Sequence, residues 1–369
     1  MSPPRAFIAG GSGRSPSRAG KDARIAFAAA HVVADPTAAA DGPARLDWDA
    51  TLAFRHHLWR LGLGVADAMD TAQRGRGLDW PAARELIQRS GREAAAVGGL
   101  LACGAGTDQL PPGPADLAAI RAAYAEQAAV VEEAGAQVVI FASRELAATA
   151  RDSSDYAAVY GWLLRQLSQP AILHWLGPAF DESLSSYWGS PDLDEAAAGL
   201  LSIVAEHRDK VAGIKLSLLD ASREVRLRRA LPPGVRLYTG DDYHYLRLIR
   251  GDRFGHSDAL LGVFDPIAVP AAEALRALAA GDTARYDKLL APTLPLARHL
   301  FAAPVPNYPT GITFLAWLAG HQQHFVMLGG QHTARSLRHL KRLYGLALTA
   351  GVLPDHDLAA QRAASLGIR

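Results

Sequence analysis

One lysine stands inside an apolar stretch that has the length of a β-strand. The stretch covers residues 211–217 and reads Val-Ala-Gly-Ile-Lys-Leu-Ser, so that its lysine is Lys215. Only five of the 38 Lys and Arg residues are lysines. Arginine keeps its proton at any working pH, whereas a buried lysine can lose it and attack a carbonyl carbon. We therefore predict that Lys215 is a nucleophile, the alternative being a strand-end lysine whose amine reaches solvent.

A histidine lies within the preceding apolar run. Residues 170–173 read Pro-Ala-Ile-Leu and lead to His174. Imidazole titrates near neutral pH, so it can carry the protons that carbonyl chemistry requires. We predict that His174 is a general acid or base that acts together with Lys215. The alternative is a histidine that is hydrogen-bonded at a strand end and has a structural role.

Short apolar runs alternate with longer amphipathic stretches from residue 24 onward. The amphipathic stretches carry apolar residues at intervals of three and four, which is typical of helices packed on a sheet. The eight apolar runs predict strands over residues 24–33, 64–70, 99–106, 137–142, 171–176, 211–217, 235–241 and 259–265. The amphipathic stretches predict helices over residues 48–61, 81–97, 115–134, 155–167, 193–207 and 243–249.

Eight such units predict a (β/α)8 barrel over residues 24–281. An open, doubly wound sheet is the competing architecture. It requires a glycine-rich loop after the first strand, and Ala28-Ala29-Ala30-His31 is not one. Residues 282–369 predict a helical extension packed on the barrel, and residues 1–23 a disordered or peripheral tail. The helices following the eighth strand are expected over residues 268–280, 284–301, 311–321 and 333–350.

Polar residues collect at the predicted carboxyl ends of the strands, where barrels of this class place their active sites. The tyrosine Tyr308, from the C-terminal extension, could cover the site or simply pack. The single cysteine, Cys103, lies in an apolar run and is predicted to be a core residue. The predicted rim consists of His31, Asp35, Asp70, Thr71, Thr107, Asp108, Ser143, Arg144, Glu145, His174, Trp175, Lys215, Ser217, Thr239, Gly240, Asp241, Asp242 and Asp265.

The second half of the sequence resembles the dihydrodipicolinate synthase and N-acetylneuraminate lyase superfamily of class I aldolases. Gly213-Ile214-Lys215 is similar to the strand of that family that carries the Schiff-base lysine. The Tyr-Thr-Gly-Asp-Asp sequence at 238–242 is similar to its strand-seven signature. The resemblance implies a lyase in which Lys215 forms an imine with a carbonyl substrate while a C–C bond is made or broken. It implies no cofactor, and a homodimer or homotetramer.

Two departures from the family pattern leave the substrate open, either a 2-oxo acid or a sugar-derived carbonyl compound. His174 stands where the family has a tyrosine that relays protons, and the family's carboxylate-binding loop is replaced by residues 69–75. We predict substrate contacts from Asp70, Thr71 and Gln73 in this loop, and from Thr239 and Asp241 on strand seven. Arg74 and Arg76 could add positive charge, and Asp242 could instead cap the next helix.

Two other functions remain open from the sequence. His31, Asp70, His174, Asp241, His256 and Asp265 include the residue types of a divalent metal site, so a metal-dependent barrel hydrolase or isomerase is one alternative. However, strand one has no His-x-His pair, and we predict no metal. A non-catalytic ligand-binding barrel is the other alternative, because one barrel fold hosts many functions.

Composition sets the remaining expectations. The chain has 369 residues, 49% of them hydrophobic and 20% charged, as in ordinary globular proteins. A formal net charge of +1 gives no electrostatic reason to expect a nucleic acid or an anionic membrane as partner. The first residues lack the apolar segment of a signal peptide, and one cysteine cannot form an internal disulfide. We therefore expect a cytoplasmic protein that acts on a small molecule.

Overall fold

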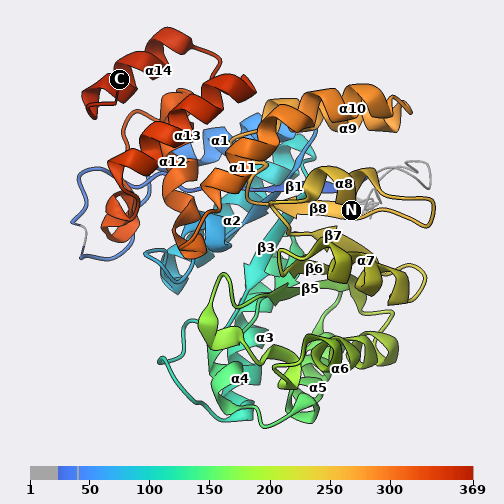
Figure 1. Cartoon of the computed structure of the whole chain (residues 1–369). Helices are drawn as coiled ribbons and strands as arrows, with labels where there is room; N and C mark the ends of the chain where they lie inside the picture. Colours follow the sequence, from blue (N-terminus) through green and yellow to red (C-terminus); the bar gives the residue numbers. More distant parts are fainter. Residues whose placement is uncertain (1–23, 40, 369) are drawn as a thin grey trace, which may run out of the picture.

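Eight parallel strands close into a barrel in the order of the sequence. A computed structural model describes residues 24–39 and 41–368, and the tail predicted at residues 1–23 lies outside them. The barrel has helices around it, so the predicted (β/α)8 fold is confirmed and the doubly wound sheet is wrong (Figure 1). The strands are β1 (Ala26–Ala29), β2 (Gly64–Asp67), β3 (Leu101–Ala105), β4 (Gln137–Ile140), β5 (Ala171–Leu176), β6 (Val211–Ser217), β7 (Arg236–Thr239) and β8 (Asp258–Leu261).

Several strands are shorter than their apolar runs. β1 ends at Ala29, although the apolar run continues to Val33. The next residues are buried, but His31 donates its backbone N–H to a carboxylate oxygen of Asp265 at 2.8 Å rather than to a neighbouring strand. Hydrophobicity predicts burial, whereas strand length depends on where backbone pairing stops. The sequence pattern therefore marks the buried segment rather than the end of the strand.

Aspartates begin many of the barrel helices. Asp47, Asp79 and Asp192 each accept a hydrogen bond from a backbone N–H in the first turn of the helix that follows. Such N-caps satisfy donors that have no partner within the helix. The helices of the barrel are α1 (Trp48–Arg60), α2 (Trp80–Val97), α3 (Leu117–Glu133), α4 (Arg144–Thr149), α5 (Ser153–Gln166), α6 (Leu193–Glu206), α7 (Ala221–Ala230), α8 (Tyr245–Arg250) and α9 (Ala268–Ala279), with short 3₁₀ turns η1 (Asp70–Ala72), η2 (Glu182–Leu184) and η3 (Tyr187–Gly189).

Aromatic side chains fill the interior of the barrel beneath the carboxyl ends of the strands. Phe27 of β1 and Tyr238 of β7 lie in one apolar cluster, with their ring centroids 6.2 Å apart. A Cβ atom at Gly213 would lie 2.7 Å from the Tyr238 ring, so glycine is required on β6 for this ring to enter. The packed interior forms a floor, and the two cavities that contain Lys215 and His174 lie above it.

The C-terminal helices pack against the barrel on the side opposite α4, α5 and α6 (Figure 1). Every residue of α12 is buried. The single helix predicted over 284–301 is divided at residues 291–293, which include Pro292, because proline interrupts helical hydrogen bonding. The last helix, α14, was not among the predicted ones. These elements are α10 (Thr283–Leu290), η4 (Ala291–Thr293), α11 (Leu294–Leu300), η5 (Val305–Asn307), α12 (Tyr308–Leu318), η6 (Leu328–Thr333), α13 (Leu337–Ala350) and α14 (His356–Ser365).

The predicted boundary at residue 281 falls in the turn between α9 and α10, and the division into two domains stays a prediction.

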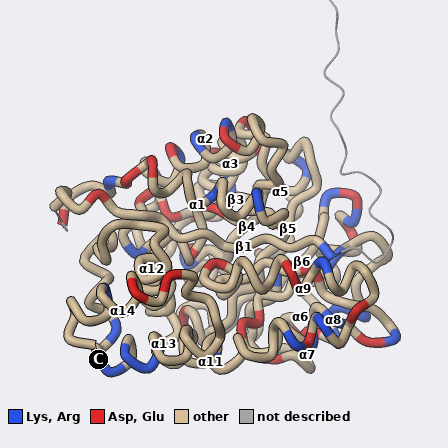
Figure 2. Tube along the Cα trace, turned by 90° about the horizontal axis from the view of Figure 1, so that it is seen from above, with Lys and Arg blue, Asp and Glu red and all other residues tan. Residues whose placement is uncertain are grey.

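Basic and acidic residues are interspersed around the periphery of the part that the structure describes (Figure 2). No helix among the described residues is long and apolar enough to cross a membrane.

A buried ion pair should contribute strongly to the stability of the first half-barrel. The Arg55 guanidinium donates two hydrogen bonds to Asp67, at 2.8 and 3.1 Å, and neither side chain is exposed to solvent. We expect Arg55→Met to lower the free energy of unfolding by about 3–5 kcal/mol, because it leaves a buried carboxylate without its partner. Arg89→Met, which breaks an exposed pair with Glu85, is the control and should cost less than about 1 kcal/mol. Chemical denaturation would measure both, and equal losses would contradict the prediction.

Candidate functional site

Two adjoining cavities open at the carboxyl ends of the strands. The smaller one surrounds Lys215 and has a free volume of about 10 Å³, roughly the space that one water molecule needs. The larger one lies beside His174 and has a free volume of about 70 Å³. Asp70 and Leu176 line both cavities, so the two spaces meet at these side chains. The site is therefore a small chamber around an amine, joined to a wider one.

The amine of Lys215 lies in surroundings that favour its neutral form. Lys215 is 7% exposed and lies at the carboxyl half of β6, between His174 of β5 and Tyr238 of β7. Burial lowers the pKa of Lys215 from its ordinary value, while the carboxylates of Asp70 and Asp242 oppose that shift. Glycine at position 240 leaves room for the side chain, because a Cβ atom there would lie 3.2 Å from Cε of Lys215.

The two aspartates after β7 turn in different directions. Asp241 accepts hydrogen bonds from the backbone N–H groups of Tyr243 and His244, and pairs with the His244 ring at 2.8 Å. It lines neither cavity. Asp242 accepts the backbone N–H of Val263 at 2.8 Å and lines the Lys215 chamber. Burial raises the pKa of Asp242 to about 7, so this carboxyl can exchange a proton near neutral pH.

The C-terminal extension closes the Lys215 chamber. Tyr308 is the first residue of α12, and its hydroxyl lies 3.0 Å from the hydroxyl of Thr71. Its ring stacks on Phe301, with centroids 4.4 Å apart, and meets Phe180 edge to face. Thr71 and Tyr308 both line the chamber. A residue more than two hundred positions away therefore completes the wall that the loop after β2 begins.

His174 faces the larger cavity and is bonded to Ser217 of β6. Its Nε2 lies 3.1 Å from the Ser217 hydroxyl, and its buried Nδ1 has no partner among the described residues. Burial, reinforced by the charge of Lys215, holds the pKa of His174 well below its ordinary value. The ring is therefore neutral at physiological pH. A proton can enter or leave it only by transfer to or from a group hydrogen-bonded to one of its nitrogens.

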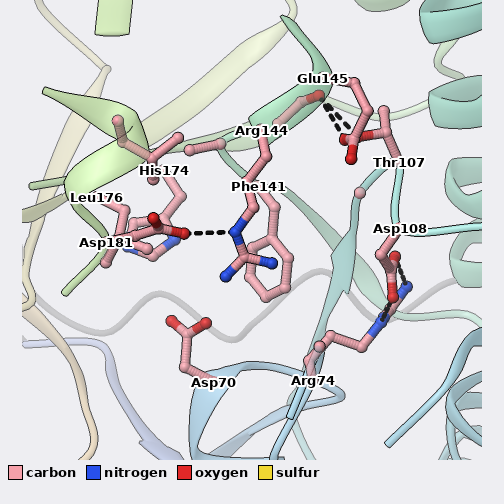
Figure 3. A pocket seen from close by; sticks show the side chains of 15 residues that line it. Asp70, Arg74, Thr107, Asp108, Phe141, Arg144, Glu145, His174, Leu176 and Asp181 are labelled. Carbon is pink, nitrogen blue, oxygen red and sulfur yellow. Dashed lines mark hydrogen bonds and ion pairs between the residues drawn. The ribbon is translucent and has the colours of Figure 1, made fainter. Parts of the chain in front are cut away.

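Charged side chains surround the larger cavity, with Arg144 reaching toward its centre (Figure 3). Arg144 donates through Nε to Asp181, at 2.5 Å. Arg74 lies across the cavity and makes two 2.6 Å bonds to Asp108. Burial by itself would raise the pKa of Asp108, but the bonds from Arg74 outweigh it and hold the pKa below its usual value. The two arginines of this cavity therefore differ: Arg74 uses its terminal nitrogens in hydrogen bonds within the protein, whereas Arg144 is bonded only through Nε.

Some of the predicted site residues lie elsewhere. Thr239 points to the outside of the barrel, where its hydroxyl donates to Glu224 at 2.9 Å. Gln73 adopts a left-handed backbone conformation and donates to the carbonyls of Arg76 and Leu328. Arg76 donates to Asn307 and Gln331 in the C-terminal segment. Of the predicted set, Lys215, His174, Asp70 and Thr71 line the two cavities.

Several cavity residues were not among the predicted site residues. For Asp242 the sequence leaves open a substrate contact or a helix cap, and for Tyr308 a cover over the site or simple packing. Arg144 stood only among the polar residues at the strand ends. Asp181 lies in the loop after β5 and carries no sequence signal apart from being a loop aspartate. Its position depends on how that loop folds back over the barrel.

The metal donors proposed as an alternative are dispersed. No three His, Cys, Asp or Glu side chains among the described residues gather in an arrangement that could hold a metal ion. His31 pairs with Asp265 at 2.7 Å, and Asp241 pairs with His244. His256 precedes β8 and therefore lies at the opposite end of the barrel. The six donors named from the sequence are therefore not gathered into one divalent metal site in the described part of the chain.

Because burial raises the pKa of Asp242, replacing this carboxyl with an uncharged group should stabilise the folded protein at high pH. Because folding raises its pKa, stability linked to this carboxyl is complete below 3.8 and is lost as the pH rises through about 7. Asp242→Asn keeps the acceptor for Val263 but cannot ionise. We expect it to gain on the order of 2–4 kcal/mol over the wild type when unfolding is measured at pH 8 rather than at pH 5. Asp194→Asn, at an exposed site, is the control, and the same pH-dependent gain there would contradict the assignment.

Comparison of structures finds the fold of this chain in dihydrodipicolinate synthases. The enzyme from Aquifex aeolicus shares 14% identity at a TM-score of 0.69, over 89% of this chain and 99% of that one. A putative dihydrodipicolinate synthetase from Pseudomonas aeruginosa shares 18% identity at a TM-score of 0.69, with the same coverage. The Acinetobacter baumannii synthase, solved in complex with pyruvate, shares 16% identity at a TM-score of 0.65, over 90% of this chain and 100% of that one.

These likenesses confirm the predicted resemblance at the level of the fold. A search of curated protein sequences gives no match. A family model, by contrast, matches residues 9–367. The chain therefore belongs to the family described as "Protein of unknown function (DUF993)", and it has the barrel fold of the dihydrodipicolinate synthases.

Proposed function

We propose that this protein is a lyase of the class I aldolase type, in which Lys215 forms an imine with a small carbonyl compound. The observation that carries the proposal is the buried amine of Lys215 at the carboxyl end of β6, in a chamber with room for about one water molecule. Burial lowers the pKa of Lys215. A neutral amine is the reactive form, and few waters compete with it for the carbonyl carbon.

The fold is compatible with this proposal, because dihydrodipicolinate synthases have the same barrel. The synthase from Acinetobacter baumannii was solved in complex with pyruvate, which is a carbonyl compound of the proposed kind. One barrel fold serves many reactions, so the reaction has to be argued from the site. The site has an amine and two carboxyl groups in the Lys215 chamber, and a histidine and further carboxyl groups in the adjoining cavity.

Two proton transfers are needed to form the imine. The Lys215 nitrogen attacks the carbonyl carbon, and the proton that the nitrogen loses is transferred to the carbonyl oxygen, which gives the carbinolamine. The carbinolamine hydroxyl then gains a second proton and leaves as water, which gives the iminium. Asp242 suits both transfers, because burial raises its pKa to about 7 and it lines the same chamber. Asp70 also lines it, and burial likewise raises the pKa of Asp70 against the opposing charges of Lys215 and Arg144.

The resulting iminium acts as an electron sink for the later step. When a bond to the adjacent carbon breaks, its electron pair moves toward the positive nitrogen, and an enamine forms. His174 stands on the neighbouring strand and is joined to Ser217. In the proposed mechanism, this neutral pair moves the proton that leaves or enters at that carbon.

Borohydride trapping tests the nucleophile. Incubation with hydroxyacetone, pyruvate or 4-oxopentanoate, followed by reduction, should add at Lys215 the mass of one probe less its carbonyl oxygen, as read by intact mass and peptide mapping. Lys215→Met should abolish this addition. Lys288→Met, at an exposed lysine outside both cavities, should leave it unchanged. Labelling at another lysine, or at none with any probe, would refute the imine mechanism, and tight binding without trapping would point to the ligand-binding alternative.

The role of His174 can be separated from imine formation. We expect His174→Asn still to trap a probe on Lys215, because the amine itself is unchanged. Exchange of the protons next to the probe's carbonyl with deuterium from solvent should slow by about 10²–10⁴-fold, the usual contribution of a general acid or base. Proton NMR in D₂O measures this exchange. Equal losses of trapping and exchange would assign His174 to positioning Lys215 instead.

A further inference from the structure

The two cavities differ in the charge that they can accept. The Lys215 chamber is lined by the carboxyl groups of Asp70 and Asp242, and Lys215 is its only lining cation. Its other lining residues are apolar or bear hydroxyl groups. A substrate carboxylate in this chamber would therefore lie against the two carboxyl groups already there, in a space of low water content.

This arrangement disfavours a carboxylate bonded directly to the reacting carbonyl carbon. Such a carboxylate lies one bond from the atom that Lys215 attacks, so it would have to share the small chamber. The positive charge of an iminium at Lys215 would already face Asp70 and Asp242. No arginine lines the chamber within the described part of the chain.

The larger cavity is lined by arginines, which the chamber lacks among the described residues. Asp181 holds Arg144 through Nε only, and Asp181 is itself fixed by the backbone N–H and the hydroxyl of Ser183. The two terminal nitrogens of Arg144 make no hydrogen bond to another described residue, and in Figure 3 they extend between Phe141 and Asp70. They present the paired donors that match the two oxygens of a carboxylate.

Arg74, the other arginine of this cavity, is already occupied. Its Nε and terminal nitrogens bond to Asp108, to the side-chain oxygen of Gln127 and to the carbonyl of Ala68. Arg144 is also given space by the opposite loop, since a Cβ atom at Gly75 would lie 3.3 Å from its Nη1. The binding capacity for an anion therefore rests on Arg144.

The path between the two cavities is partly apolar. Leu176 belongs to both, and Phe141 and Leu184 line the larger one. Asp70, Asp108, Asp181 and Glu145 also surround the larger cavity, which disfavours a dianion such as a phosphate monoester more than a single carboxylate.

We propose that the substrate is an oxo acid in which a short chain of carbon atoms separates the carbonyl group from a single carboxylate. The carbonyl enters the Lys215 chamber, the chain passes Leu176, and the carboxylate binds Arg144. This inference rests on the proposed imine chemistry. It excludes 2-oxo acids such as pyruvate as the preferred imine-forming substrate.

The test compares three probes by the concentration that gives half-maximal borohydride trapping on Lys215. They are 4-oxopentanoate, its uncharged methyl ester and pyruvate, each normalised to its trapping by butylamine in solution. We expect 4-oxopentanoate to trap at a concentration at least about tenfold below the other two, as one charge-assisted hydrogen-bond pair provides. Arg144→Gln should remove this advantage and leave trapping of the ester unchanged.

Arg151→Gln is the matched control, because Arg151 is an exposed arginine paired with one aspartate and lines neither cavity. It should preserve the advantage of 4-oxopentanoate. Trapping of pyruvate at the lowest concentration, or an equal effect of Arg144→Gln on acid and ester, overturns this inference while the imine mechanism stands. Failure of all three probes to trap on Lys215 refutes the imine mechanism, and with it this inference.

Discussion

Burial of one amine against two carboxyl groups is the constraint on which the site depends. Removing Lys215 from water favours its neutral form, while Asp70 and Asp242 favour its charged form. The same burial raises the pKa of both aspartates. Asp242, whose pKa burial raises to about 7, can exchange protons near neutral pH, which imine formation requires.

The rest of the molecule maintains that burial. Phe27 and Tyr238 close the barrel from below, and Gly213 admits the Tyr238 ring. Tyr308 closes the chamber from above, held by Phe301 and by the hydroxyl of Thr71. The C-terminal helices thus contribute directly to the site, since α12 supplies part of its wall. Because these contacts exclude water, water does not stabilise the charged form of the Lys215 amine and does not compete with the amine for the carbonyl carbon.

The two cavities separate reaction from recognition. The chamber around Lys215 has groups suited to nucleophilic attack and proton transfer, whereas the larger cavity has Arg144 and the polar groups around it. A substrate that spans both has its reactive end positioned by its charged end, which lowers the entropy cost of the reaction. Asp70, in the loop after β2, lines both cavities and therefore lies where the reacting end and the charged end of a substrate would meet.

The sequence alone determined the barrel, the order of its strands and the place of Lys215 and His174, because these depend on local hydrophobic periodicity and on residues within the strands. It did not determine which loop side chains turn inward. Asp241 and Asp242 are neighbours with the same side-chain chemistry. Asp241 accepts hydrogen bonds from backbone N–H groups that follow it, whereas Asp242 accepts one from Val263 in another loop and lines the chamber. Thr239 is one residue beyond Tyr238, so strand alternation turns it outward toward Glu224. Tyr308 and Arg144 reach the cavities through contacts between segments distant in the chain, and only tertiary packing decides such contacts.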